Sequence, residues 1–135
     1  MTSKKGFTLI EILVVISIIG VLALMGLRVY LNQQDKAKNA MVKANAGTVQ
    51  TLIQAELADR NFNTRDEAAL YIADNAGLHN PFNSAPMDKP LDFPKVDDVS
   101  ALAPGKITIT LSNGVFYIQG YGADGLLPDI LTARR

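Results

Sequence analysis

The chain has 135 residues, enough for one domain besides a membrane anchor. Its 13 basic and 13 acidic residues give a net charge of zero, which offers no reason to expect binding to nucleic acid. The chain contains no cysteine, so a disulfide is excluded, and its single histidine, His79, cannot form a site that needs two histidines. No catalytic set of residues and no glycine-rich phosphate loop before a helix is present, so we expect neither enzyme activity nor a cofactor.

Residues 7–27 are apolar and long enough to cross a membrane. Glu11 is the only ionisable side chain in this segment, and about 20 apolar residues span a bilayer as a helix. A carboxylate inside such a helix is costly, so it is kept where it has a partner or a function. The alternative is a plain membrane anchor in which Glu11 lies shallow enough to reach the lipid headgroups.

The residues at the start of this segment form a specific motif. A polar leader carries Lys4 and Lys5. Gly6 and Phe7 follow, and Glu11 is the fifth residue after Gly6. The stretch KKGFTLIE, followed by a spanning helix, resembles the N-terminus of type IV pilins and of the pseudopilins of type II secretion. A secretory signal peptide fits less well, because its apolar stretch has about 7–15 residues and ends at a small-residue cleavage site.

The resemblance implies how the N-terminus is processed. In this family a membrane aspartyl peptidase, the prepilin peptidase, cuts after the glycine, so cleavage is expected between Gly6 and Phe7. The same enzyme usually N-methylates the new terminus, here Phe7. The resemblance therefore implies a cleaved leader over residues 1–6, a transmembrane and polymerisation helix over residues 7–28, and a soluble head over residues 29–135.

The resemblance also implies a role for Glu11 in assembly. The corresponding glutamate is thought to pair with the terminal amine of a neighbouring subunit, so Glu11 is expected to bind the Phe7 amine of another copy. The implied partners are copies of the chain, the prepilin peptidase, the pilus or secretion assembly machinery in the inner membrane and, before assembly, membrane lipid. The precursor is expected in the bacterial inner membrane, and the product in an extracellular or cell-surface filament.

Helical character continues beyond the apolar segment. Residues 29–60 contain no proline and one glycine, Gly47. The spacing predicts an amphipathic helix, with its apolar stripe at Ala37, Met41, Ala44, Thr48, Leu52 and Ala55, and with Val42, Val49, Ile53 and Leu57 beside it. We expect one continuous helix over residues 7–60. The alternative is two helices with a break, for which Gly20 and Gly26 are the candidate weak points, because glycine costs up to about 1 kcal/mol inside a helix.

The remaining residues predict a small α+β head. A helix is expected over residues 65–75, burying Ala69, Leu70 and Ile72 or Ala73 and stopping at Gly77. A proline-rich loop follows. Alternating residues predict two antiparallel strands over residues 107–111 and 115–119, with a tight turn between them. Glycines and a proline then predict turns and a C-terminal tail. The fold class is therefore a long N-terminal α-helix packed on a small antiparallel sheet.

Two aspartates are weak candidates for a calcium site. Some pseudopilins bind calcium in their C-terminal loop, which makes a site at Asp124 or Asp129 conceivable. No loop in the chain shows a recognisable spacing of ligands, however, so solubility and turn formation explain these residues better. The sequence therefore predicts no metal centre.

The leading hypothesis is a structural subunit that polymerises through its N-terminal helix into a type IV pilus, serving adhesion, motility or DNA uptake. Within the same class, a pseudopilin of a type II protein secretion system is the alternative. A membrane-anchored binding or sensor domain that never polymerises is the alternative of another class. Glu11 argues against this last hypothesis, because an anchor alone has no need of a charge in its span.

Overall fold

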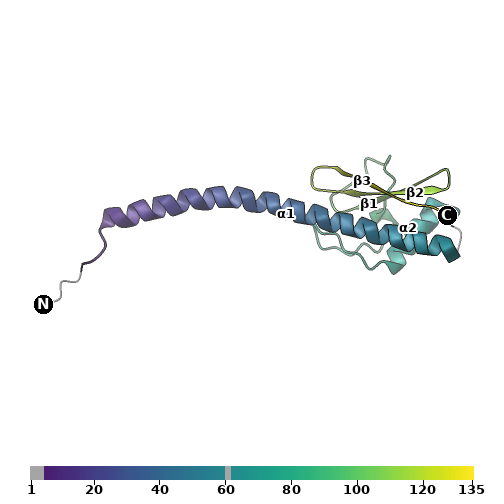
Figure 1. The fold of residues 1–135 in the computed structure, drawn as a ribbon, viewed down its shortest axis with the longest axis horizontal. Coiled ribbons are helices and arrows are strands. Elements are labelled where there is room, and N and C mark those ends of the chain that lie inside the picture. The colour runs from purple at the N-terminus through teal and green to yellow at the C-terminus, as the bar shows by residue number, and fades with distance from the viewer. Residues whose placement is uncertain (1–4, 60–61) are drawn as a thin grey trace. The chain divides into compact units, whose positions relative to one another are not determined.

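The computed structural model describes residues 5–59 and 62–135, and its fold is α+β (Figure 1). One long helix is followed by a shorter helix, a turn of 3-10 helix and three strands. Their bounds are α1 Leu9–Asp59, α2 Arg65–Asn75, η1 Pro90–Asp92, β1 Ile107–Ser112, β2 Val115–Tyr121 and β3 Leu126–Ala133. The predicted long helix is confirmed as one unbroken element. Lys4 and Arg60 lie outside the described residues.

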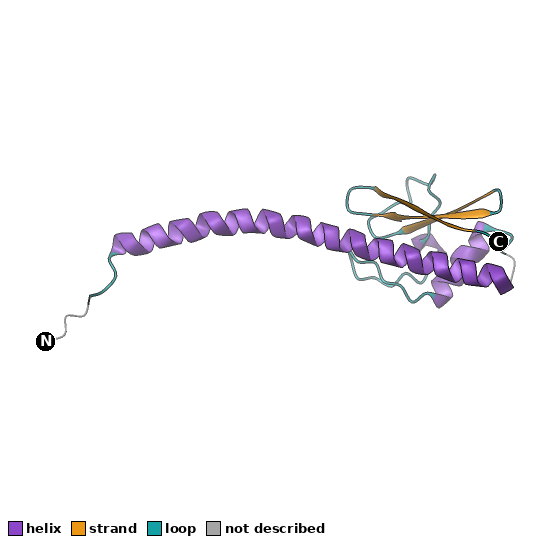
Figure 2. Ribbon diagram, in the orientation of Figure 1, coloured by secondary structure: helices purple, strands orange, loops and turns teal. Residues whose placement is uncertain are grey.

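The chain forms two compact units, Met1–Gln34 and Asp35–Arg135. The described part of the first unit is the apolar half of α1 with its short lead-in, and every side chain in it is exposed. The second unit holds the rest of α1 together with α2 and the sheet (Figure 2). We call this second unit the head.

The sheet of the head has the strand order β1-β2-β3, and both pairings are antiparallel. The β1–β2 hairpin closes on the pair Ser112 and Val115. Asn113 and Gly114 form its turn with φ values of 51° and 76°. Left-handed backbone at both central residues is what a two-residue hairpin requires, and Asn-Gly adopts it most readily. The predicted hairpin is confirmed.

The third strand was missed by the sequence analysis, which assigned turns and a tail to this part of the chain. Leu126–Ala133 instead pairs with β2, for example Leu131 with Ile118. Gly125, the residue before β3, has a φ of 145°, a backbone conformation that glycine adopts readily. The turn that precedes β3 ends at this residue. Pro128 is compatible with β3 because this strand is at the edge of the sheet, where a missing N–H leaves no ladder bond unmade.

The core of the head lies between α1, α2 and the sheet. On α1 the buried residues are Val42, Ala46, Val49, Ile53 and Leu57. One part of the predicted broad stripe is confirmed, because Val42, Val49, Ile53 and Leu57 are buried. The other part is wrong, because most of it is exposed, namely Ala37, Met41, Ala44, Thr48 and Ala55. The two sets share the same helical period. The larger aliphatic set is buried because it removes more apolar area from water.

Helix α2 begins and ends where its sequence predicts. The Thr64 hydroxyl accepts a hydrogen bond from the Glu67 N–H at 3.2 Å, and the Glu67 carboxylate accepts one from the Thr64 N–H at 3.3 Å. This capping box fixes the first turn. Gly77, with a φ of 58°, follows the C-cap. Ala69 and both Ile72 and Ala73 are buried as predicted, but Leu70 is exposed, and Ala68 is buried in its place.

A glycine sets the spacing between α1 and the sheet. A Cβ at Gly120 on β2 would lie 2.4 Å from Cγ1 of Val42 and 3.2 Å from Cδ1 of Leu127. Both neighbours belong to packed elements, so the backbone of β2 approaches α1 as closely as it does only because residue 120 lacks a side chain.

We therefore predict that Gly120→Ala lowers the free energy of unfolding by about 1–3 kcal/mol, the usual cost of overpacking. Chemical denaturation of the detergent-solubilised chain measures this change. Gly47→Ala is the matched control, because a Cβ there meets nothing within 4 Å and the substitution should stabilise α1 by up to about 1 kcal/mol. Equal changes in the free energy of unfolding for the two substitutions would contradict the close approach of β2 to α1.

Candidate functional site

The start of α1 carries a capping box that includes Glu11. The Thr8 N–H donates to the Glu11 carboxylate at 3.0 Å, and the Glu11 N–H donates to the Thr8 hydroxyl at 3.3 Å. Two of the N–H groups that a helix start leaves unpaired are thereby satisfied. Thr8 was not among the predicted site residues, although T-x-x-E before an apolar run is the sequence signature of this motif.

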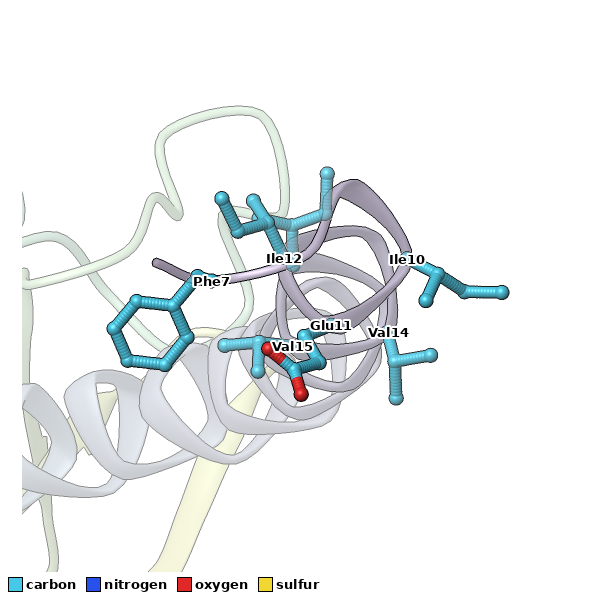
Figure 3. Close-up of a pocket in the computed structure, with 7 residues that line it drawn as sticks. Phe7, Ile10, Glu11, Ile12, Val14 and Val15 are labelled. Atoms are coloured by element: carbon cyan, nitrogen blue, oxygen red, sulfur yellow. The ribbon is translucent and has the colours of Figure 1, made fainter. Parts of the chain in front are cut away.

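The Glu11 carboxylate lies in apolar surroundings. A recess of about 600 Å³ is lined by Phe7, Ile10, Glu11, Ile12, Val14, Val15 and Ile16. Figure 3 shows the carboxylate as the one charged group among the side chains that it labels. One oxygen accepts the bond from Thr8. A carboxylate has room for several donors, so a cation or a further N–H could bind here.

The surface around this recess is apolar and exposed. The side chains from Phe7 to Leu31 that the structure describes are all exposed, and Phe7 itself is 87% exposed. A contiguous apolar surface of this length indicates a membrane or a protein interface. In length and composition α1 also qualifies as a membrane-spanning helix.

The other predicted site residues are spread along the chain. Gly20 and Gly26 lie within α1, where a Cβ would meet nothing within 4 Å, and Gly6 precedes the helix. Asp129 forms an ion pair of 2.6 Å with Lys43. Asp124 is exposed. Within residues 5–59 and 62–135, no group of three or more metal-binding side chains is present.

The single histidine, His79, has an exposed side chain. The backbone carbonyl of His79 accepts a hydrogen bond from Nδ2 of Asn45 on α1 at 3.0 Å. The residue therefore helps to fasten its loop to α1 through its backbone, which any residue could do.

A family model matches the N-terminus of the chain, and known proteins match longer parts of it. The family model "Prokaryotic N-terminal methylation motif" matches residues 1–27. The "Type IV major alpha-pilin" of Moraxella bovis is 29% identical over 114 residues, covering 84% of this chain and 72% of the relative. "Fimbrial protein EcpB" of Eikenella corrodens is 36% identical over 76 residues, covering 56% and 48% respectively.

A third relative is the "Type IV major fimbrial protein FimA" of Dichelobacter nodosus, which is 38% identical over 56 residues. That match covers 42% of this chain and 36% of the relative. The chain thus spans 72% of the Moraxella relative named first and half or less of the other two. No solved structure matches the chain.

We predict that Thr8→Ala loosens the first turn of α1. Replacing an N-cap threonine by alanine costs about 1 kcal/mol, so the amides of the first turn should exchange with solvent about fivefold faster. Hydrogen exchange followed by NMR in detergent micelles measures this rate. Thr8→Ser keeps the hydroxyl and serves as the control. Identical exchange in all three proteins would show that the Thr8 hydroxyl does not cap the helix.

Proposed function

The chain belongs to the type IV pilin family, and from this premise we propose that Glu11 and Phe7 form the contact through which copies of it assemble into a filament. It is a structural subunit of a pilus, as its relatives are named major pilins and fimbrial proteins. The single observation that carries the proposal is the Glu11 carboxylate, fixed by Thr8 within an apolar recess.

The electrostatic argument starts from the cost of the carboxylate. In low dielectric an ionised group without partners is strongly disfavoured, and the bond from the Thr8 N–H offsets part of that cost. The second oxygen and its lone pairs stay available to a donor. A positively charged N-terminal amine of a neighbouring copy supplies both charge and N–H groups, so docking stabilises Glu11 more than lipid does. Glu11 thereby favours one register between adjacent helices.

Formation of that amine requires processing. We propose that the prepilin peptidase cleaves after Gly6 and N-methylates Phe7, which creates the terminus that Glu11 binds. The match of residues 1–27 to a methylation motif supports this step. Removal of the leader also removes Lys4 and Lys5, so the apolar helix begins at the new terminus.

Location follows from the same helix. The apolar half of α1 and the pilin relatives indicate a membrane-anchored precursor and a pilus on the surface. The proposed precursor lies in the bacterial inner membrane, where lipid, the peptidase and the assembly machinery are its partners. The names of the relatives favour a pilus over a secretion pseudopilin. Adhesion, motility and DNA uptake stay predictions for the role of the filament.

We predict that the assembled protein begins at N-methyl-Phe7. Mass spectrometry of filaments sheared from cells should give an N-terminal peptide that starts at Phe7 and carries one methyl group. Gly6→Val should block cleavage, because it changes the residue after which the proposed cut is made, and should leave the precursor in the membrane. Filaments that retain Met1 would contradict the proposal.

We predict that Glu11→Gln and Glu11→Val leave membrane levels and cleavage unchanged but abolish most filaments. Removing one partner of a buried ion pair costs roughly 3–5 kcal/mol, enough to disfavour each addition of a subunit. Immunoblots of membranes measure the level and the cleavage of the protein, and electron microscopy of the cell surface measures the number of filaments. Asp35→Asn, which removes a charge from the same helix beyond the apolar segment, is the control. Abundant normal filaments of Glu11→Val would show that helix packing alone drives assembly.

A further inference from the structure

Two glutamines of α1 bond the outer edge of β3 and Arg134, the residue that directly follows this strand. Nε2 of Gln50 donates to the Thr132 carbonyl at 2.8 Å. Nε2 of Gln54 donates to the Arg134 carbonyl at 2.7 Å, and its Oε1 accepts from the Arg134 N–H at 3.1 Å. The Gln54 amide therefore pairs with both backbone groups of one residue, just as a peptide group of a neighbouring strand would.

Two further features protect the same strand. Pro128 has no N–H to offer to another strand. Asp129 places a charge on the edge and pairs with Lys43 of α1 at 2.6 Å. Proline and charge are the usual means by which proteins prevent edge-to-edge pairing. A recess of about 470 Å³ is lined by Lys43 and Ala46 of α1 and by residues 127–131 of β3. The glutamines bond the chain beyond this recess, at Thr132 and Arg134.

The opposite edge of the sheet is covered as well. The Ile109 N–H of β1 donates to the Pro94 carbonyl at 3.0 Å, and Nε of Arg65 donates to the Ile109 carbonyl at 3.1 Å. The Arg65 guanidinium also bonds Asp66 at 2.7 Å and thereby lowers the pKa of that carboxyl. Backbone groups at both edges are thus paired by segments from outside the sheet.

We propose that Gln50 and Gln54 form a latch that closes the edge of β3 against strand addition from a second copy of the chain. The closed edge would leave the N-terminal helix as the surface through which copies associate, and this part of the inference rests on the proposed function. A second copy is the competing partner because an antiparallel pair of identical edge strands is self-complementary. Ile130, 56% exposed, and Leu126, 39% exposed, would supply apolar contacts to such a pair. A protein that gathers many copies at one place has particular need of this protection.

The test uses the full chain in detergent micelles and the double variant Gln50→Met, Gln54→Met. Methionine keeps the length of glutamine and removes the amide. The C-terminal peptide containing Arg134 should exchange its amide hydrogens about tenfold faster, because the bond that protects the Arg134 N–H is lost together with the two bonds that hold the Thr132 and Arg134 carbonyls. The variant should also form thioflavin-positive oligomers at concentrations where the wild type stays monodisperse by gel filtration. Gln33→Met, an exposed substitution on the same helix, should behave as the wild type.

A third variant distinguishes edge pairing from unfolding. Adding Ile130→Lys to the double variant places a charge on the exposed edge and should suppress the oligomers without restoring protection of the C-terminal peptide. The latch is refuted if the double variant keeps wild-type exchange and stays monodisperse. It is also refuted if the oligomers lose helical circular dichroism or persist with Ile130→Lys. None of these readouts depends on filaments in cells, so failure of the proposed function would be seen separately.

Discussion

One helix has to satisfy two different environments, and the rest of the structure follows from that constraint. The first half of α1 exposes apolar side chains on all sides and has to be covered by lipid or by other helices. The second half buries a single stripe, Val42 to Leu57, against α2 and the sheet. Within the apolar residues 7–27, Glu11 is the only charged side chain. Its capping bonds with Thr8 make the charge tolerable in the monomer while leaving acceptor capacity for a second molecule.

Features that depend on residues close together in the sequence were predictable. The motif around Gly6 and Glu11 identifies the family from a short stretch. The start of α2 follows from Thr64 and Glu67, and the hairpin from Asn113 and Gly114, because caps and tight turns depend on neighbouring residues. The capping role of Thr8 was equally visible in the sequence. Glu11 has a second explanation as a charge in an apolar segment, and this explanation does not involve Thr8.

Features that depend on distant parts of the chain were not predictable in the same way. Strand β3 contains Pro128 and three exposed residues in a row, Pro128 to Ile130, so neither propensity nor alternation marks it. It exists because β2 and the glutamines of α1 bond it from both sides. The predicted stripe of α1 was too wide, because small and large residues recur with one period. Which set faces the sheet is decided by packing, as the exposed Leu70 on α2 also illustrates.

The bond between Gln54 and Arg134 joins residues 80 positions apart, and this separation has a consequence for the timing of biosynthesis. At about 5–20 residues per second, a ribosome adds Arg134 roughly 4–16 s after Gln54. The apolar start of the chain is therefore available to the membrane while the sheet is still missing its last strand. Because no cysteine is needed to finish the fold, completion of the head does not depend on an oxidising compartment.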